Sequence, residues 1–322
     1  MVASRIRAPG GLVLMRIALS ASIVLAAVLC AASALGAPDR LFVSVRITPA
    51  GEYTSEIEGP AVDAVGNLFV VNLHRAGTIG ELPPGASSSR LFAVLPEGSI
   101  GSSIRFDCEG RMFVADYRRH NIFVFDPGSN TPKLYFHSNE FSQPNDLAMA
   151  RDGTLFASDP DFTRHSGRVW RIERAADGAA IGAPMRSARP MGETNGIDLS
   201  PDGATLYVSE TETREIWAYQ IDGKALTHPR LIVRFPAFKV DGLRTDRAGR
   251  LFVARPGAGT IAIVSPDGKI LREVALQGKY PTNLTFGGPD GRTVFVTQVD
   301  GGFIEAFKTD VPGREPCCGS RC

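Results

Sequence analysis

The chain has 322 residues, of which 43% are hydrophobic, and its formal charge at pH 7 is +1. This length suits one large domain or two ordinary ones, and the nearly neutral charge gives no support to a nucleic-acid-binding protein. The 34 glycines and 22 prolines, without long apolar stripes at helical spacing, indicate many short strands joined by turns rather than a helical protein.

The first 36 residues have the pattern of an export signal. Three arginines precede an uncharged run over residues 17–37, and Ala34 and Gly36 suit cleavage before residue 37. An uncleaved anchor is the alternative, because the run is long enough to span a bilayer, but its Ala and Ser content makes it poorly hydrophobic. We therefore expect cleavage, no stable membrane insertion afterwards, and a periplasmic or secreted protein. Removing residues 1–36 would bring the formal charge to −2.

Six copies of a strand–turn–strand pattern follow, each centred on a turn glycine. The copies are residues 58–72, 102–117, 145–159, 195–210, 241–255 and 283–297. Their turn glycines are Gly66, Gly110, Gly153, Gly203, Gly249 and Gly291, with successive spacings of 42–50 residues. Two further extended runs lie between copies, so each unit holds four strands in about 45 residues. The pattern predicts an all-β fold, a six-bladed β-propeller, over residues 37–310.

One predicted strand, residues 40–48, stands ahead of the six units. The sixth unit has only three strands, the last of them near residues 303–308. Unpaired strand edges are unfavourable because they invite association with other chains. We therefore expect the N-terminal strand to pair with the last blade and close the ring.

The residue eight positions before each turn glycine carries a side-chain oxygen. These residues are Glu58, Ser102, Asn145, Asn195, Asp241 and Asn283. The repeat places them at the entry of each innermost strand, beside the central channel. A wet rim that collects polar residues would give a similar pattern, but no Lys, Arg or Gln occurs among them. Two carboxylates and two amides form an all-oxygen set that suits a hard divalent cation, Ca²⁺ above all, whereas Zn²⁺ prefers His or Cys.

Four of these positions carry a resemblance to the senescence-marker-protein/gluconolactonase/luciferin-regenerating-enzyme (regucalcin-like) family. The matching motifs are Glu58-Gly59-Pro60, Asn145-Asp146-Leu147, Asn195-Gly196-Ile197 and Asp241-Gly242-Leu243, with residues 286–297 in the last blade. The resemblance covers roughly residues 55–308 and implies a six-bladed propeller with one divalent ion in the channel. The ion would be Ca²⁺ first, with Mg²⁺, Mn²⁺ and Zn²⁺ as alternatives.

The same resemblance implies residue roles. Glu58, Asn145, Asn195 and Asp241 would hold the ion, and Asp241 would act as general base, with a nucleophilic role as the alternative. Many family members hydrolyse lactones, and relatives with a similar site cleave organophosphates. An ion of this kind can polarise a carbonyl and stabilise the oxyanion that forms on water attack.

Other polar residues are candidates for supporting roles. Asp146 follows Asn145 on a predicted strand, so its side chain is expected to point away from the axis, either fixing nearby amides and waters or bonding backbone. Candidate substrate contacts are Arg118, Arg164 and His165 in loops, and Gln143, Ser102 and Asn283 near the ring. Sugar-lactone members of the family carry Arg at the position of Gln143, which puts gluconolactone itself in doubt.

The C-terminal residues 311–322 form a tail with Cys317, Cys318 and Cys322. Without a nearby His, these thiols make a poor zinc site, and we expect a disulfide within the tail or a loose end. For the whole protein we expect a metal-dependent hydrolase of a small lactone or ester. The alternatives are an organophosphate hydrolase, a binding scaffold with a structural ion, and a strictosidine-synthase-like propeller.

Overall fold

Six antiparallel sheets follow one another along the chain in the order that the repeats predict. The computed structural model describes residues 40–314. Blades 1 to 3 contain β2 (Tyr53–Val62), β3 (Leu68–Leu73), β4 (Thr78–Leu82) and β5 (Arg90–Val94); β6 (Gly101–Phe106), β7 (Met112–Asp116), β8 (Asn121–Phe125) and β9 (Lys133–His137); β10 (Leu147–Met149), β11 (Leu155–Asp161), β12 (Ser166–Arg174) and β13 (Ala180–Pro184). Blades 4 to 6 contain β14 (Arg186–Ser187), β15 (Thr194–Leu199), β16 (Thr205–Glu210), β17 (Glu215–Asp222) and β18 (Ala225–Arg234); β19 (Leu243–Thr245), β20 (Leu251–Arg255), β21 (Thr260–Val264) and β22 (Ile270–Ala275); β23 (Pro281–Gly287), β24 (Thr293–Gln298) and β25 (Phe303–Lys308), with β1 (Val45–Arg46).

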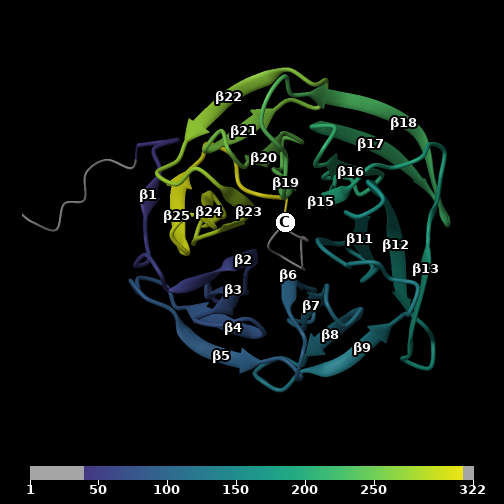
Figure 1. The fold of residues 1–322 in the computed structure, drawn as a ribbon, viewed down its shortest axis with the longest axis horizontal. Helices are drawn as coiled ribbons and strands as arrows, with labels where there is room; N and C mark the ends of the chain where they lie inside the picture. The colour runs from purple at the N-terminus through teal and green to yellow at the C-terminus, as the bar shows by residue number, and fades with distance from the viewer. Residues whose placement is uncertain (1–39, 315–322) are drawn as a thin grey trace, which may run out of the picture. The chain divides into compact units, whose positions relative to one another are not determined.

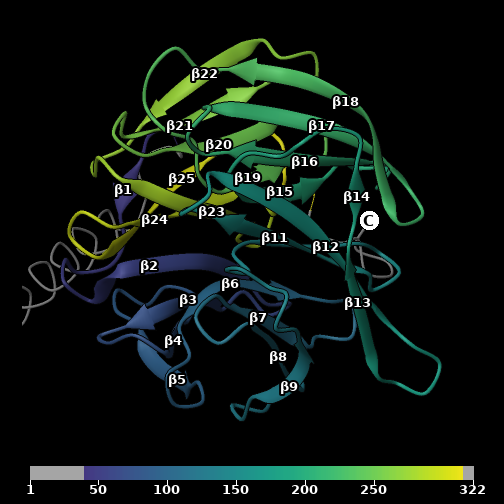
Figure 2. The same ribbon diagram turned by 45° about the vertical axis from the view of Figure 1, so that its right-hand side comes forward.

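The sheets stand side by side in a ring (Figures 1 and 2). The strands nearest the centre are β2, β6, β10, β15, β19 and β23, and those toward the periphery are β5, β9, β13, β18, β22 and β1. The all-β, six-bladed propeller predicted from the repeats is therefore confirmed. The six turn glycines all have positive φ, between +68° and +96°. Glycine adopts this left-handed conformation without a steric penalty, which explains its recurrence at each hairpin. One addition was not predicted: the short β14 runs parallel to β18 at the edge of blade 4.

The N-terminal strand closes the last blade, as predicted. In β1, Val45 and Arg46 pair antiparallel with Ala306 and Glu305 of β25. Just beyond it, the Ile47 N–H donates to the carbonyl oxygen of Ile304 at 2.9 Å. Blade 6 is thus built from both ends of the described chain.

Deleting residues 40–48 is expected to unfold the protein, because the edge of β25 would lose its hydrogen-bonded partner and the ring its closure. Circular dichroism and thermal melting would measure the loss. A chain that begins at Arg40 is the matched control and should melt as the mature protein does. A stable, active protein without residues 40–48 would contradict this role.

The hydrophobic core is divided among the blade interfaces. Six clusters of buried apolar side chains occur among residues 40–314, and each spans two neighbouring blades. For example, Phe69 and Ile79 of blade 1 pack with Ile104 and Phe125 of blade 2, while Ile304 of blade 6 packs with Tyr53 of blade 1. An interface on both sides of every blade is the packing that a closed ring requires.

Some predictions fall outside the described residues. They are the signal segment, residues 1–36, and the tail cysteines Cys317, Cys318 and Cys322. Between residues 40 and 314, no helix has the length and apolar character needed to cross a membrane. Residues 311–314, assigned to the tail, pack against the propeller: the Gly313 N–H donates to the carbonyl of Gly291 at 3.0 Å.

Candidate metal centre in the channel

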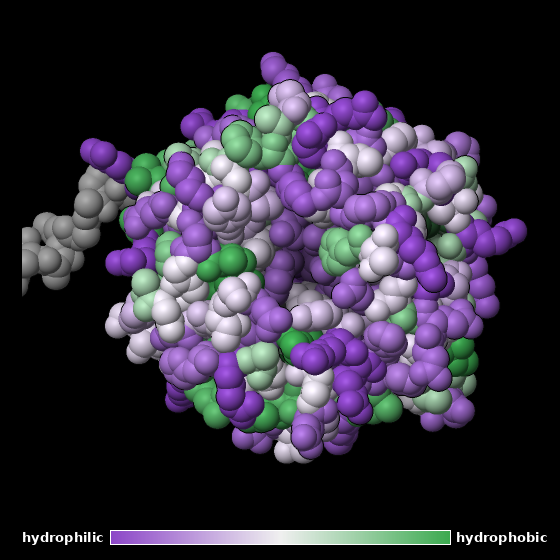
Figure 3. All heavy atoms as spheres, in the orientation of Figure 1, coloured by the Kyte–Doolittle hydropathy of each residue, from purple (hydrophilic) through white to green (hydrophobic). Residues whose placement is uncertain are grey.

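The six predicted oxygen-bearing residues lie in the innermost strands or just before them, near the centre of the ring. Figure 3 shows a hollow at the centre of the ring, with hydrophilic residues inside it. Three ring residues are followed directly by Gly59, Gly196 and Gly242. A Cβ added to any of these glycines would lie 2.3–2.5 Å from an atom of the next blade. The blades therefore approach too closely for a side chain there, and this close approach brings the ring residues together.

Hydrogen bonds between neighbouring blades hold the polar side chains of the ring. The Glu58 carboxylate accepts from a backbone N–H at 2.7 Å and from Asn283 Nδ2 at 3.1 Å. The Asn195 amide hydrogen-bonds to Asp241. The contact between Asn283 and Glu58 joins blades 6 and 1, and the contact between Asn195 and Asp241 joins blades 4 and 5. Four of the six ring positions are thus linked in pairs across blade boundaries.

The two ring carboxyl groups oppose each other's ionisation. Enclosure in the channel raises the pKa of Glu58 from 4.5 to about 8, and the charge of Asp146 adds to the shift. Enclosure also raises the pKa of Asp241 well above its ordinary value, with the charge of Glu58 as the next cause. Both residues keep some solvent-accessible surface, so small molecules and ions have access to them. Two confined acids in contact with solvent form a place where a cation is favourable.

Asn145 and Asn195 each hold a buried side-chain oxygen without a hydrogen-bond partner. Such an unpaired oxygen costs roughly 1–3 kcal/mol. Between residues 40 and 314, no group of three or more His, Cys, Asp or Glu side chains could hold a metal ion by itself, so a metal site here must draw on amide oxygens. Two carboxylates with two unpaired amide oxygens form a donor set typical of Ca²⁺. The residues present therefore fit a divalent ion.

A buried salt-bridge layer lies further along the channel, built on Asp146. Arg244 of blade 5 places Nη1 2.7 Å from Asp146 Oδ2 and Nη2 2.9 Å from Oδ1. Arg105 of blade 2 places Nη2 3.1 Å from Asp146 Oδ1. All three side chains are at most 4% exposed. Burial raises the pKa of Asp146, and the nearby Arg105 opposes that rise.

The orientation predicted for Asp146, away from the axis, is wrong, because guanidinium groups from blades 2 and 5 both reach it. Side-chain alternation holds within a strand, but β10 begins only at Leu147. Asp146 supports the ring through its charge, which raises the pKa of both Glu58 and Asp241.

Two ring residues named as substrate contacts have supporting positions. The Ser102 hydroxyl donates to the backbone carbonyls of Pro144 and Asn145, at 3.0 and 2.8 Å, so it fixes the backbone beside one candidate ligand. Asn283 is fully buried, and its amide holds Glu58 as described above. Both side chains use their donors within the protein.

The remaining candidates lie in loops around the channel. Arg118 is exposed, and Arg164 pairs with Asp161 at 3.3 Å. His165 Nδ1 lies 2.6 Å from Glu193 Oε1. Gln143 donates its backbone N–H to Asp159 at 2.7 Å. Contact with substrate stays a prediction for all four.

Sequence reasoning missed the two arginines of the buried layer. A signal was present: Arg105 and Arg244 each stand three residues after a ring position, inside strands that are otherwise suited to burial. A charged residue at such a point indicates a buried partner of opposite charge, because an unpaired charge would be very costly there. The alignment of the six repeats does not by itself show that the partner is Asp146.

Comparison with protein families gives a match over most of the chain. The sequence model of the family described as "SMP-30/Gluconolactonase/LRE-like region" matches residues 58–300. A gluconolactonase of Zymomonas mobilis is 26% identical over 289 residues, which cover 78% of this chain and 79% of the relative. Diisopropyl-fluorophosphatase of Loligo vulgaris is 26% identical, with 81% of this chain and 91% of the relative covered.

Solved structures show the same fold. The crystal structure of regucalcin from Agrobacterium tumefaciens, titled a calcium-binding protein, has a TM-score of 0.69 and 20% identity. The match covers 85% of this chain and 99% of that chain. At this identity the likeness supports the propeller architecture and nothing finer.

Proposed function

Because the chain belongs to the SMP-30/gluconolactonase/LRE-like family, we propose that it hydrolyses lactones or closely related esters with one divalent ion. The observation that carries the proposal is the pair of unpaired amide oxygens, on Asn145 and Asn195, beside two enclosed carboxylates. Glu58, Asn145, Asn195 and Asp241 would hold the ion. Ca²⁺ is the first choice, because every donor is an oxygen and a structural relative is titled a calcium-binding protein.

When bound, the ion would supply a Lewis acid that polarises the carbonyl of the substrate. The protein's own residues would do the rest. Asp241 would accept the proton of the attacking water. The Asn195 amide orients Asp241, and Asn283 orients Glu58 through the bond at 3.1 Å. Asp146 would keep both carboxyl groups basic by its negative charge.

Removing the ion with EDTA is expected to abolish lactone hydrolysis, and added Ca²⁺ to restore it. The melting temperature of the ion-free protein should also fall between pH 5 and pH 8, roughly the interval between the ordinary and raised pKa of Glu58. In this interval the folded protein keeps a proton that the unfolded chain has released, so rising pH favours unfolding.

Melting curves with EDTA or Ca²⁺ at several pH values would measure this effect. Glu58→Gln is the control, because it removes one titrating group and should weaken both Ca²⁺ binding and the pH dependence. Turnover and melting that do not change with EDTA would contradict the role of the ion. A lack of turnover on any lactone, ester or fluorophosphate would leave the chain a propeller scaffold.

We propose that exposed aromatic side chains in the two segments before Asp241 and Asn283 favour a substrate with an apolar part. Phe238 and Tyr280 stand three residues before Asp241 and Asn283, and they are 54% and 53% exposed. The buried Arg255 fixes the first of these loops, since its guanidinium donates to the carbonyls of Ala237 and Lys239. Exposed aromatic side chains at a site entrance bind apolar groups by removing them from water.

Phe238→Ala is expected to lower kcat/KM for lactones with acyl or aryl substituents by about tenfold, a modest fraction of an aromatic side chain's burial energy. For gluconolactone the change should stay within about twofold. Steady-state kinetics on both lactones would measure the difference. Equal losses on the two substrates would exclude Phe238 from substrate selection.

We also propose that the protein is exported. The arginine-flanked apolar segment of residues 1–36 supports this. A second support is that Cys108 is disulfide-bonded, since disulfides persist outside the reducing cytoplasm. Cell fractionation, with mass spectrometry of the mature N-terminus, would test it. A cytoplasmic protein that begins at Met1 would contradict the proposal.

A further inference from the structure

A cavity of about 530 Å³ lies between blades 1 and 2, bordered by the hairpin turns that follow β2 and β6. Glu58 and Ser102, the ring residues of these two blades, stand five residues before Asp63 and Asp107 in the turns. Because a strand advances about 3.3 Å per residue, the cavity is roughly 15 Å from the ring, toward the other end of the blades. It is therefore separate from the candidate metal centre, and its volume is typical of a small-molecule site.

The walls of the cavity are aromatic, and contacts between the rings fix them. The apolar side chains that line it include Phe69, Phe92, Phe106, Met112 and Phe125. The centroid of the Phe69 ring lies 4.9 Å from that of Phe92 and 5.5 Å from that of Phe106. Phe92 and Phe106 are only partly buried, so both keep apolar surface that a ligand could cover. A preformed wall of this kind binds apolar and aromatic groups by removing them from water.

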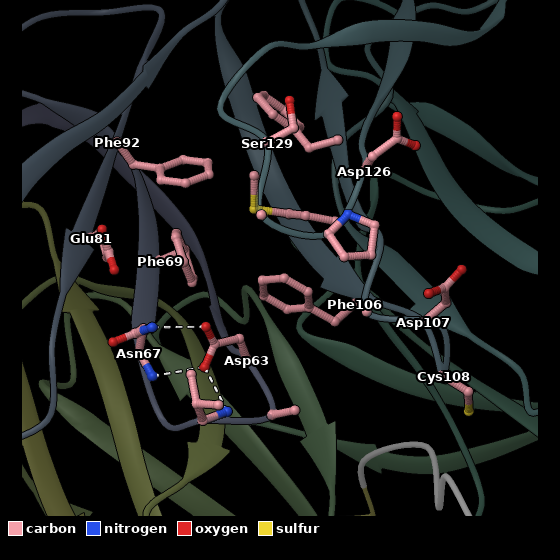
Figure 4. A pocket seen from close by; sticks show the side chains of 17 residues that line it. Asp63, Asn67, Phe69, Glu81, Phe92, Phe106, Asp107, Cys108, Asp126 and Ser129 are labelled. Carbon is pink, nitrogen blue, oxygen red and sulfur yellow. Dashed lines mark hydrogen bonds between the residues drawn. The ribbon is translucent and has the colours of Figure 1, made fainter.

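The charged side chains at the cavity are all acidic. Among the described residues that line it, there are four carboxylates and no Lys, Arg or His; the acids are Asp63, Glu81, Asp107 and Asp126. Figure 4 shows Phe69, Glu81 and Asp63 on one side and Phe106 on the other. Three of the acids form ion pairs with cations outside the lining, namely Glu81 with Arg90, Asp107 with Arg111, and Asp126 with Lys133.

Asp63 differs from the other three acids because its partners are neutral. Its carboxylate accepts the backbone N–H groups of Val65 and Asn67 at 3.0 and 2.9 Å, and Asn67 Nδ2 at 2.9 Å. These donors hold the carboxylate in place without compensating its charge. A positively charged group in the cavity would meet this charge beside the faces of aromatic rings, which also attract cations.

We propose that this cavity binds an organic cation, an ammonium group attached to an apolar or aromatic body. The phenylalanine side chains enclose the body, and Asp63 binds the ammonium group. An anion of the same shape is rejected by the four carboxylates. The ligand contacts both blades, so its binding stabilises the interface between them. This site takes no part in the proposed hydrolysis.

Three probes of matched shape test the class of ligand: 1-naphthylmethylamine, 1-naphthalenemethanol and 1-naphthoate. Calorimetric titration of the protein as isolated from cells, at pH 7, should show the amine binding about fivefold more tightly than the alcohol, and the carboxylate most weakly. The amine at a hundred times its Kd should raise the melting temperature by about 5 °C. No binding of the amine, or equal binding of all three probes, would overturn the proposal.

Substitution of Asp63 tests the location of the ammonium group. Asp63→Asn keeps an acceptor for the turn but removes the charge, so the amine should bind about fivefold more weakly and the alcohol within about twofold of before. The matched control is Asp152→Asn, in the hairpin turn of blade 3, where Asp152 accepts the Thr154 N–H at 2.9 Å and lies outside the cavity. This variant should change no affinity. Equal effects of the two variants on the amine would overturn the proposal.

Two further measurements complete the test. Phe92→Leu removes one aromatic wall and should weaken the amine and the alcohol alike; unchanged affinities would exclude the aromatic walls. The ring carboxylates could also attract an amine, so the titration is repeated with EDTA and with saturating Ca²⁺, and the affinity for the amine should stay within about twofold. Displacement of the amine by Ca²⁺ would place it at the ring and overturn the proposal. None of these readouts depends on lactone hydrolysis.

Discussion

Replacing Asp241 with Asn is expected to lower kcat for lactone hydrolysis by about 10³-fold, the middle of the range for a general base. The amide keeps an oxygen for the ion but cannot accept a proton from water. The fold should be retained, and the ion-free variant should be at least as stable as the parent. This follows because one of two mutually repelling carboxyl groups becomes neutral. Steady-state kinetics at saturating Ca²⁺ and thermal melting would measure both effects.

Glu58→Gln is the matched control for Asp241→Asn. Both variants change a ring carboxylate into its amide, but Glu58 is assigned to ion binding alone. At saturating Ca²⁺, Glu58→Gln should therefore keep most of the parent's kcat, whereas Asp241→Asn should not. Full activity of Asp241→Asn would show that Asp241 is not the base.

A nucleophilic role for Asp241 has a separate signature. In water labelled with oxygen-18, a covalent intermediate at Asp241 would place the label in its carboxylate, and mass spectrometry of the tryptic peptide of residues 240–244 would detect it. With Asp241 as a base, the label would enter only the product acid. The two roles predict the same loss for Asp241→Asn, so labelling is needed to separate them.

The propeller and its ring of polar residues could be predicted because both depend on register. A turn glycine in each repeat fixes the position of the hairpin, and counting back eight residues locates the same structural point in each blade. The closure by residues 40–48 could be predicted because an open edge at each end of the chain suggests a pair. Neither prediction needed the three-dimensional distance between any two side chains.

The buried layer around Asp146 depended on distances that register does not give. Arg105 and Arg244 belong to blades 2 and 5, and their contact with blade 3 depends on how long side chains cross the channel. The prediction for Asp146 also assumed regular strand alternation before β10 had begun. For the same reason, register did not show that the donors of Ser102 and Asn283 bond neighbouring blades. Their contact with substrate stays a prediction.

The layers along the channel suggest how the candidate site keeps its charge. The ring holds two carboxyl groups, and the next layer holds one carboxylate with two guanidinium groups. Further along, Asp198 pairs with Arg314 at 2.5 Å. The channel thus holds three arginines against four acids, so a net charge of −1 remains for a cation to neutralise when all the acids are ionised.

Asp146→Asn is expected to lower the free energy of unfolding by about 3–5 kcal/mol, because it leaves Arg105 and Arg244 buried without a compensating negative charge. Both guanidinium groups are at most 4% exposed and have little access to water. Urea denaturation in EDTA would measure the loss without a contribution from bound ion.

The matched control is Glu81→Gln, whose partner Arg90 is 69% exposed and can be solvated. That variant should lose less than about 1 kcal/mol. Replacing the triad Arg105, Asp146 and Arg244 by Met, Leu and Met should recover much of the stability, since no charge then remains buried. Similar losses for Asp146→Asn and Glu81→Gln would mean that water reaches the layer, and Asp146 could not then influence the ring carboxyl groups through a low-dielectric interior.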